Sequence, residues 1–308
     1  MCGHCGCAIS SKVAIHDLQT GKEMMMEEGP AEPTHHHAHH HRHADRPGDS
    51  RDHDHHHEHD HNHADGTHPR HGPHRDLASG HVSSSLSVVE LEARILAKND
   101  AIAARNRAWF AGREILALNL CSSPGSGKTT LLERTIRDLK SELNLFVIEG
   151  DQATANDGER IRAAGAPVAQ VNTGTGCHLE ADMVARCVRE LRPWTRSIVM
   201  IENVGNLVCP AMFDLGEAAK AVILSVTEGE DKPLKYPHMF RAARIMIVNK
   251  IDLLAHVDFD VERADAYARQ VNPHIITLRL SALTGEGLGA WYGWLRQECA
   301  SARAGAFD

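Results

Sequence analysis

SSPGSGKTT, residues 122–130, is the stretch that decides the fold of this chain. It follows an apolar run at 115–121 that predicts a buried strand, and it opens a predicted helix from 128 to about 143. Gly125 and Gly127 allow the backbone to curl so that successive N–H groups face a phosphate beside the helix N-terminus. A strand, this glycine-rich turn and a helix, in that order, predict a P-loop. A turn that binds no nucleotide is the alternative, and the complete Gly-Lys-Thr argues against it.

The residues of this loop have predicted roles toward a nucleotide. Lys128 is expected to act in catalysis by reaching the β- and γ-phosphates, and the Thr129 hydroxyl is expected to ligate Mg²⁺. Ser122 stands where the pattern usually has Gly, a mild departure because the inner glycines carry the tight geometry. We therefore predict a phosphate-binding surface formed by Pro124, Gly125, Ser126, Gly127, Lys128, Thr129 and Thr130.

Short apolar runs alternate with helix-like segments along the rest of the chain. They lie at 145–148, 168–171, 198–201, 221–226, 245–248 and 275–280. Upstream of the loop, Ser87 is placed to cap a helix whose apolar residues approximate helical spacing. Such strands and helices are typical of a sheet covered on both faces. The predicted fold class is α/β, a P-loop NTPase with a mostly parallel sheet.

A second motif indicates which base is bound. Asn249-Lys250-Ile251-Asp252 follows the apolar run at 245–248 and resembles the NKxD element of GTPases. There an aspartate accepts hydrogen bonds from guanine N–H groups, which adenine lacks, so discrimination is large. Ser281 and Ala282 end a later predicted strand and resemble the last guanine-contacting element. The predicted ligands are therefore GTP and GDP.

Two acidic strand ends lie between these motifs. Asp151 ends the strand after the P-loop helix and is placed near Mg²⁺ or the attacking water, although a solvated turn carboxylate is the alternative. Glu202 is expected to hold Mg²⁺ through water, and the Gly205 N–H to sense the γ-phosphate. Neither an arginine finger nor a water-positioning glutamine can be identified, so slow intrinsic hydrolysis is expected.

The composition of the chain divides it into three parts. Of 24 histidines, 18 lie within residues 35–81, a stretch that is nearly devoid of large apolar side chains. Such a stretch buries too little apolar surface to offset its ordering entropy. We expect a Cys-rich metal-binding motif at 1–12, a mostly disordered His-rich segment at 13–82 and a GTPase domain at 83–308.

The N-terminal arm is predicted to bind metal in two ways. Cys2, Cys5 and Cys7 form C-x-x-C-G-C and can chelate one ion, with the Cys2 amine as a fourth ligand suited to Ni²⁺. A redox dithiol is the alternative, and no βαβ context supports it. The histidine tract reads as a reservoir for Ni²⁺, Zn²⁺ or Cu²⁺, with a purely solubilising tract as the alternative.

A third set of metal ligands is predicted inside the domain. Cys177 and His178 are adjacent at a loop-to-helix junction, and Cys209 follows the Glu202 strand end. Two ligands do not complete a site, so a symmetric dimer sharing two Cys-His pairs is one solution; a small buried Cys without metal is the alternative. The remaining cysteines, Cys121, Cys187 and Cys299, have apolar neighbours and read as structural.

The overall composition narrows the classes of partner. A net charge of −8 and 4% aromatic residues give no basic or stacking surface for nucleic acid. No apolar run approaches the ~20 residues that span a bilayer. The N-terminus lacks the features of a signal peptide, so a cytoplasmic location is expected.

Seven stretches together resemble the HypB family of hydrogenase nickel incorporation proteins, GTPases of the SIMIBI class. They are the terminal C-x-x-C-G-C, the His-rich insertion, SSPGSGKTT, EGDQATANDGERI, NTGTGCHLEADMV, ENVGNLVCP and NKID. The resemblance covers essentially the whole chain. It implies GTP-dependent nickel delivery to a [NiFe]-hydrogenase precursor, a GTP-promoted homodimer and a HypA-type metallochaperone partner. It also implies a tight nickel site at Cys2, Cys5 and Cys7, and a weaker nickel or zinc site at Cys177 and His178 with Cys209 nearby.

Other functions are weighed against this one. The urease accessory GTPase is also nickel-linked, but its metal element is Cys-Pro-His, whereas Cys177 and His178 are adjacent. A nickel or zinc storage protein with a vestigial nucleotide site would be expected to have lost one of Gly127, Lys128, Thr129 or Asp252. An ATP-driven metal inserter would be excluded if only guanine nucleotides compete for binding.

Overall fold

The computed structural model describes residues 13–25, 87–151 and 156–305. Within them, nine strands form one sheet in the order β2-β1-β5-β4-β6-β3-β7-β8-β9. Pairing is parallel from β5 to β9 along this order and antiparallel where β1 meets β2 and β5. The strands are β1 (Ala14–Asp17), β2 (Lys22–Met25), β3 (Leu116–Ser122), β4 (Leu145–Asp151), β5 (Val168–Asn172), β6 (Ile198–Glu202), β7 (Ala219–Ser225), β8 (Ala243–Asn249) and β9 (Ile276–Arg279).

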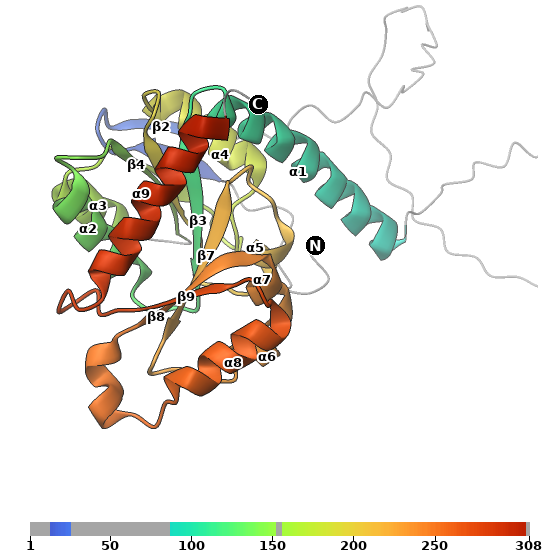
Figure 1. Ribbon diagram of the computed structural model, residues 1–308. Helices are drawn as coiled ribbons and strands as arrows, with labels where there is room; N and C mark the ends of the chain where they lie inside the picture. Colours follow the sequence, from blue (N-terminus) through green and yellow to red (C-terminus); the bar gives the residue numbers. More distant parts are fainter. Residues whose placement is uncertain (1–12, 26–86, 152–155, 306–308) are drawn as a thin grey trace, which may run out of the picture. The chain divides into compact units, whose positions relative to one another are not determined.

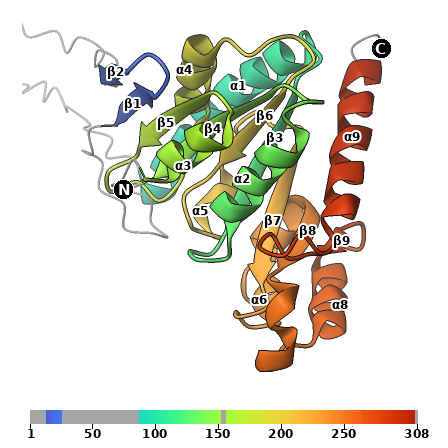
Figure 2. The same ribbon diagram turned by 90° about the vertical axis from the view of Figure 1, so that its left-hand side faces the viewer.

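Helices cover both faces of the sheet, as the sequence predicted (Figures 1 and 2). One core cluster joins α2, α3 and α9 to the sheet, and two others join α1 and α4, and α7 and α8, to its opposite face. The helices are α1 (Val88–Ala111), α2 (Lys128–Leu139), α3 (Asn156–Ala164), α4 (Ala181–Leu191), α5 (Cys209–Met212), α6 (Lys232–Lys235), α7 (Pro237–Ala242), α8 (Val261–Val271), α9 (Leu288–Ala304) and the 3₁₀ helix η1 (Ile251–His256).

The central strands are buried on both sides, which explains their continuous apolar runs. In β3, Leu118 packs toward α2 and α9, and Ala117 packs toward α1 and α4. Because the strands are parallel, their carboxyl ends meet at one edge of the sheet, where ligands of open α/β sheets bind. The P-loop follows β3 at this edge.

The hairpin β1–β2 corrects the expected domain boundary. Residues 13–25 were expected to belong to the disordered segment, but β1 pairs with β5, and Ile15 is buried in the core beside α4. Asp17 closes the turn by accepting hydrogen bonds from Gln19 N (2.9 Å) and Thr20 Oγ1 (2.7 Å). The sequence did not predict this hairpin, because each strand has only four residues, too few to show an alternation of apolar and polar side chains. The rest of the expected segment lies outside the described residues.

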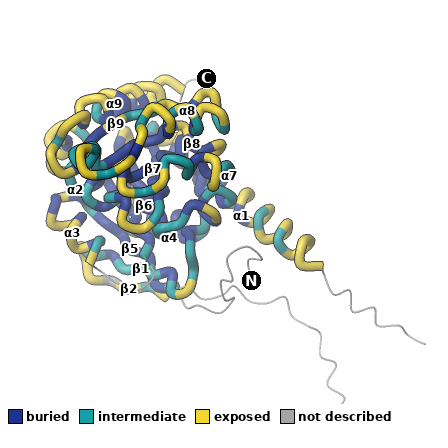
Figure 3. The backbone as a smooth tube through the Cα atoms, turned by 90° about the horizontal axis from the view of Figure 1, so that it is seen from below, coloured by how far each residue is buried: buried dark blue, intermediate teal, exposed yellow. Residues whose placement is uncertain are grey.

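Helix α1 begins where the sequence predicted. Ser87 caps it in a capping box with Glu90, since each side chain bonds to the backbone N–H of the other. The first half of α1 is largely exposed and extends away from the sheet, and its buried residues begin at Asn99 (Figure 3). Among the helices of the described residues, none is long and apolar enough to span a membrane.

Candidate functional site

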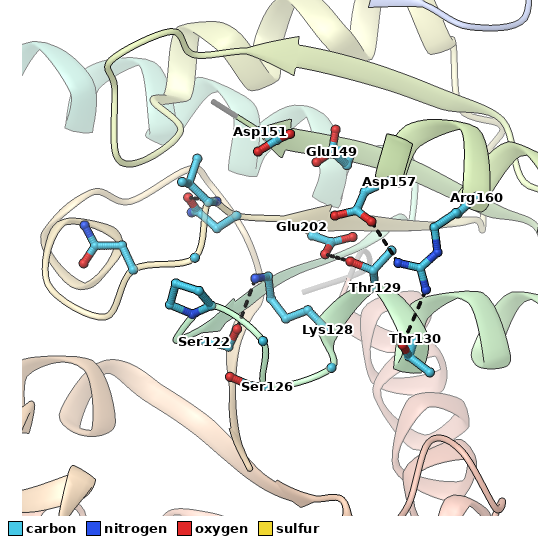
Figure 4. Close-up of a pocket in the computed structure, with 18 of the residues that line it drawn as sticks. Ser122, Ser126, Lys128, Thr129, Thr130, Glu149, Asp151, Asp157, Arg160 and Glu202 are labelled. Carbon is cyan, nitrogen blue, oxygen red and sulfur yellow. Dashed lines mark hydrogen bonds and ion pairs between the residues drawn. The ribbon is translucent and has the colours of Figure 1, made fainter. Parts of the chain in front are cut away.

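A cavity of about 710 Å³ opens at the carboxyl edge of the sheet, around the P-loop (Figure 4). The ends of β3, β4 and β6 supply its wall. The predicted residues that line it are Pro124, Gly125, Ser126, Gly127, Lys128, Thr129, Thr130, Asp151, Cys177, Glu202, Gly205 and Lys250. Gly125 and Gly127 adopt φ of 74° and 92°, the left-handed conformation that the loop requires.

The position occupied by Ser122 has a role in this cavity. Lys128 Nζ donates a hydrogen bond to Ser122 Oγ at 3.1 Å, and Ser122 Oγ donates to Ser123 O at 2.6 Å. Ser122 is buried, so its hydroxyl holds the Lys128 ammonium over the loop. The serine that replaces the usual glycine thus orients the residue that is predicted to reach the phosphates.

Carboxylates gather beside the P-loop threonine, as Figure 4 shows. Thr129 Oγ1 donates to Glu202 Oε1 at 2.7 Å, and Glu202 is paired in register with Glu149 on β4. Both glutamates are buried, and within the described residues the Oε2 atom of each lacks a hydrogen-bond partner. Burial, and then repulsion from Glu202 and Asp151, raises the pKa of Glu149 to about 9.

This donor set fits a hard divalent cation. A hydroxyl and carboxylate oxygens are the ligands that Mg²⁺ prefers, and the unpartnered buried oxygens are the groups that such an ion satisfies. Thr129, Asp151 and Glu202 were predicted as magnesium ligands, and all three lie in the cavity wall. Glu149 was missed, although it lies two residues before Asp151 and therefore on the same face of its strand.

Arg160 on α3 also lines the cavity and was not predicted. Its guanidinium donates to Asp157 Oδ1 (2.9 Å) and Glu133 Oε2 (2.8 Å), and it lies 3.5 Å from Thr130 Oγ1. The acidic residues thus hold a cation beside the start of α2. The sequence indication for Arg160 was its place in the first helix after the strand that ends at Asp151, near the predicted site.

The predicted guanine-binding residues form a separate group at the ends of β8 and β9. Asn249 Nδ2 donates to Ser126 O (2.9 Å), and Asn249 Oδ1 accepts from Ala282 N (3.1 Å), which ties the P-loop to the Ser281–Ala282 turn. Asp252 Oδ1 is buried without a hydrogen-bond partner in the described residues. Only Lys250 of this group lines the cavity described above.

The domain cysteines and histidine lie together. The ligand atoms of Cys177, His178 and Cys209 are all within 4.8 Å of one another. The two Sγ atoms are 3.0 Å apart, and Cys177 Sγ is 3.6 Å from His178 Nδ1. Burial lowers the pKa of His178 to about 4, so its imidazole is neutral near pH 7, which is the form that ligates metal. Cys177 also lines the nucleotide cavity, so the two groups of residues adjoin.

The other predicted metal ligands and the cysteines predicted to be structural differ in position. Cys2, Cys5, Cys7 and the histidine tract lie outside the described residues. Cys121, Cys187 and Cys299 are buried, as expected for structural cysteines, and burial raises the pKa of each thiol. A thiol with a raised pKa is a poor nucleophile and a poor metal ligand at neutral pH.

Comparison with known proteins gives consistent matches. Residues 116–279 match the family CobW/HypB/UreG, nucleotide-binding domain. The chain is 58% identical over 234 residues to hydrogenase maturation factor HypB of Azotobacter chroococcum, covering 76% of each chain. It is 57% identical to the Escherichia coli protein of the same name, covering 70% of this chain and 75% of the relative. The solved structure of HypB from Helicobacter pylori in complex with nickel matches with a TM-score of 0.62 and 36% identity, covering 66% of this chain and 96% of that one.

Proposed function

Because this chain belongs to the HypB group of hydrogenase maturation factors, within the CobW/HypB/UreG nucleotide-binding family, we propose that it is a GTP-hydrolysing nickel metallochaperone. In this proposal it binds and stores nickel and delivers it for maturation of a [NiFe]-hydrogenase in the cytoplasm. One observation carries the proposal: Cys177, which clusters with His178 and Cys209, also lines the cavity of the P-loop. A nucleotide and a transition-metal ion would therefore occupy adjoining sites.

Two groups of residues support GTP as the nucleotide, one proposed to bind the phosphates and the other the guanine base. Lys128 and the P-loop amides would hold the phosphates, and Asn249, Lys250, Asp252, Ser281 and Ala282 would hold guanine. Thr129, Glu202 and Asp151 would hold Mg²⁺, which neutralises charge on the phosphates when it is bound. The unpartnered Asp252 Oδ1 supports guanine over adenine, since guanine offers the N–H donors that this oxygen lacks.

The cargo site supports nickel through its chemistry. Thiolates and a neutral imidazole suit Ni²⁺ and also Zn²⁺, so both ions compete for Cys177, His178 and Cys209. Cys2, Cys5 and Cys7 would form a separate, tighter nickel site, and the histidine tract a reservoir. A GTP-dependent homodimer would bring two domain clusters together and complete their coordination. A HypA-type metallochaperone and the hydrogenase large-subunit precursor are the proposed partners.

GTP hydrolysis and nickel stoichiometry of the full chain test this function. We expect GTP to be hydrolysed, with guanine but not adenine nucleotides competing, and Ni²⁺ to bind at more than one site per chain. Lys128→Ala is expected to abolish hydrolysis and to leave Ni²⁺ stoichiometry unchanged, because Lys128 is proposed to bind the phosphates and is not one of the proposed nickel ligands. Binding of ATP in preference to GTP, or a chain that takes up no Ni²⁺, would contradict the proposal.

A further inference from the structure

Four polar side chains on or next to strands β3, β6 and β7 are buried, and none of them has been given a role so far. Asn119 is on β3, Asn203 directly follows β6, Glu217 precedes β7 and Lys220 lies on it. Each is less than 10% exposed. Buried polar groups are costly unless they are hydrogen-bonded, so such a set is stable only in a specific arrangement.

Asn203 and Asn206 hold the two metal ligands Cys177 and His178 from both sides. Asn203 Oδ1 accepts a hydrogen bond from Leu179 N at 3.1 Å, directly after His178. Asn206 Nδ2 donates to Cys177 O at 3.4 Å. Both asparagines belong to residues 203–206, which we call the switch turn. The backbone that carries these ligands is therefore attached at each end to one four-residue turn.

The buried polar side chains reach His178 by a second route. Asn203 Nδ2 donates to Asn119 Oδ1 (3.2 Å), and Asn119 Nδ2 donates to Glu217 Oε1 (3.1 Å). Lys220 Nζ donates to that same Glu217 oxygen and to Phe213 O (2.9 Å). The Phe213 ring packs on the His178 imidazole, with ring centroids 3.9 Å apart. Asn203 is thus connected to His178 both through Leu179 and through the residue that covers its ring.

The other side of the switch turn faces the P-loop. A Cβ atom on Gly205 would lie 3.1 Å from Pro124 Cγ and 3.2 Å from Pro124 N and Cα, a tight contact, so the turn packs closely against the P-loop. Glu202, directly before the turn, accepts a hydrogen bond from Thr129. A displacement of the turn by a nucleotide would therefore move the asparagines that hold the metal ligands.

We propose that Asn203 and Asn206 are positioning residues that couple the nucleotide site to the cluster of Cys177, His178 and Cys209. Exchange of GDP for GTP then changes the affinity of this cluster for a divalent transition-metal ion. By thermodynamic linkage, the ion changes the preference for GTP over GDP by the same factor. The inference rests on the proposed function, since it takes GTP as the nucleotide and Ni²⁺ as the ion.

The test measures Ni²⁺ affinity in two nucleotide states. The parent is the full chain with Cys2, Cys5 and Cys7 changed to Ser, so that Ni²⁺–thiolate absorption reports the domain cluster alone; Cys177→Ser supplies the blank. We expect the Ni²⁺ affinities with GDP and with a non-hydrolysable GTP analogue to differ at least about fivefold. In Asn206→Asp, which keeps the acceptor for Val208 N but loses the donor to Cys177 O, the ratio is expected to fall below about twofold.

Two further variants make the result specific. Asn172→Asp adds the same charge to the Cys177 loop and keeps the acceptor for Gly174 N, so it is expected to retain the parent ratio. Asn203→Ala removes the contact with Leu179 and is expected to lose the ratio; if it does not fold, Asn206→Asp decides. An unchanged ratio in Asn206→Asp, or equal affinities in the parent, overturns the inference. A parent that binds no GTP, or shows no Ni²⁺–thiolate absorption, overturns the proposed function as well.

Discussion

Thr129 Oγ1 lies 2.7 Å from Glu202 Oε1, so the first turn of the P-loop helix is bonded directly to the end of β6. The two residues are 73 positions apart in the chain and meet because β3 and β6 are adjacent parallel strands. A hydroxyl and a carboxylate that already face each other are ready to share a cation, which would replace the hydrogen bond between them. The pairing of these strands therefore organises much of the site.

Glu202→Gln tests this arrangement. The glutamine keeps an oxygen that accepts from Thr129 but loses the negative charge, so the strengthening of GTP binding by Mg²⁺ is expected to fall about 10- to 100-fold. GTP affinity with and without Mg²⁺ measures the effect. Glu298→Gln is the matched control. Glu298 is on α9 and is as buried as Glu202, but it forms an ion pair with Arg244 on β8. An unchanged magnesium dependence in Glu202→Gln would show that the ion binds elsewhere.

Glu149 is expected to make the stability of the nucleotide-free chain depend on pH. The folded chain retains a proton at Glu149 that the unfolded chain releases above its ordinary pKa of 4.5. The free energy of unfolding therefore falls as the pH rises from there to about 9. In Glu149→Gln this decline should be smaller, by up to about 1.4 kcal/mol per pH unit. Urea unfolding across this range, without Mg²⁺, measures it; parallel curves for both chains would contradict the assignment.

The sequence predicted those parts of the fold that repeat a local pattern. Every apolar run from residue 115 onward became a strand, and the glycine-rich turn became the P-loop at the expected place. The hairpin β1–β2 could not be predicted, because its strands are short and its partner β5 is more than 150 residues away. Strand pairing at that distance leaves no periodicity in either segment.

The candidate site divides in the same way. Cys177, His178 and Cys209 were each predicted as candidate ligands, and their closeness was implied by the family resemblance. They meet because the loops after β5 and β6 both lie at the carboxyl edge of the sheet. Glu149 and Arg160 were missed because their roles depend on cross-strand register and on one ion-pair geometry. The bonds between Asn203, Asn119 and Glu217 join three segments, and no spacing along the chain indicates such contacts.

Asp252→Asn is expected to change base specificity. A carboxylate accepts from two guanine N–H groups, whereas a carboxamide accepts one hydrogen bond and donates another, which matches the N1–H and C2 carbonyl of xanthine. Because a mismatched buried donor remains unpaired, GTP affinity should fall by about 10² or more while XTP affinity rises. Competition among GTP, XTP and ATP measures the change. A variant that still prefers GTP would place the guanine away from Asp252.

Nickel binding at the cluster of Cys177, His178 and Cys209 is expected to require the Cys177 thiol. Cys177→Ser should remove one bound Ni²⁺ per chain when Cys2, Cys5 and Cys7 are also Ser, since Cys177 is a proposed ligand. Cys187→Ala is the control, because Cys187 lies on the buried face of α4 and burial raises the pKa of its thiol. It should lower stability and leave nickel binding intact. An equal number of bound Ni²⁺ ions per chain in the parent, Cys177→Ser and Cys187→Ala would show that nickel does not bind at this cluster.

The hairpin gives the most direct test of the domain boundary. Ile15 is 1% exposed and packs in the cluster formed by α1 and α4, so Ile15→Ala is expected to lower the free energy of unfolding by about 2 to 4 kcal/mol. Deleting residues 28–85 leaves all of the described residues of that cluster in the chain and should leave the cooperative unfolding of the domain unchanged. Urea unfolding of the full chain, the substituted chain and the deleted chain compares the three. Full stability in Ile15→Ala would mean that the hairpin is not part of the folded domain.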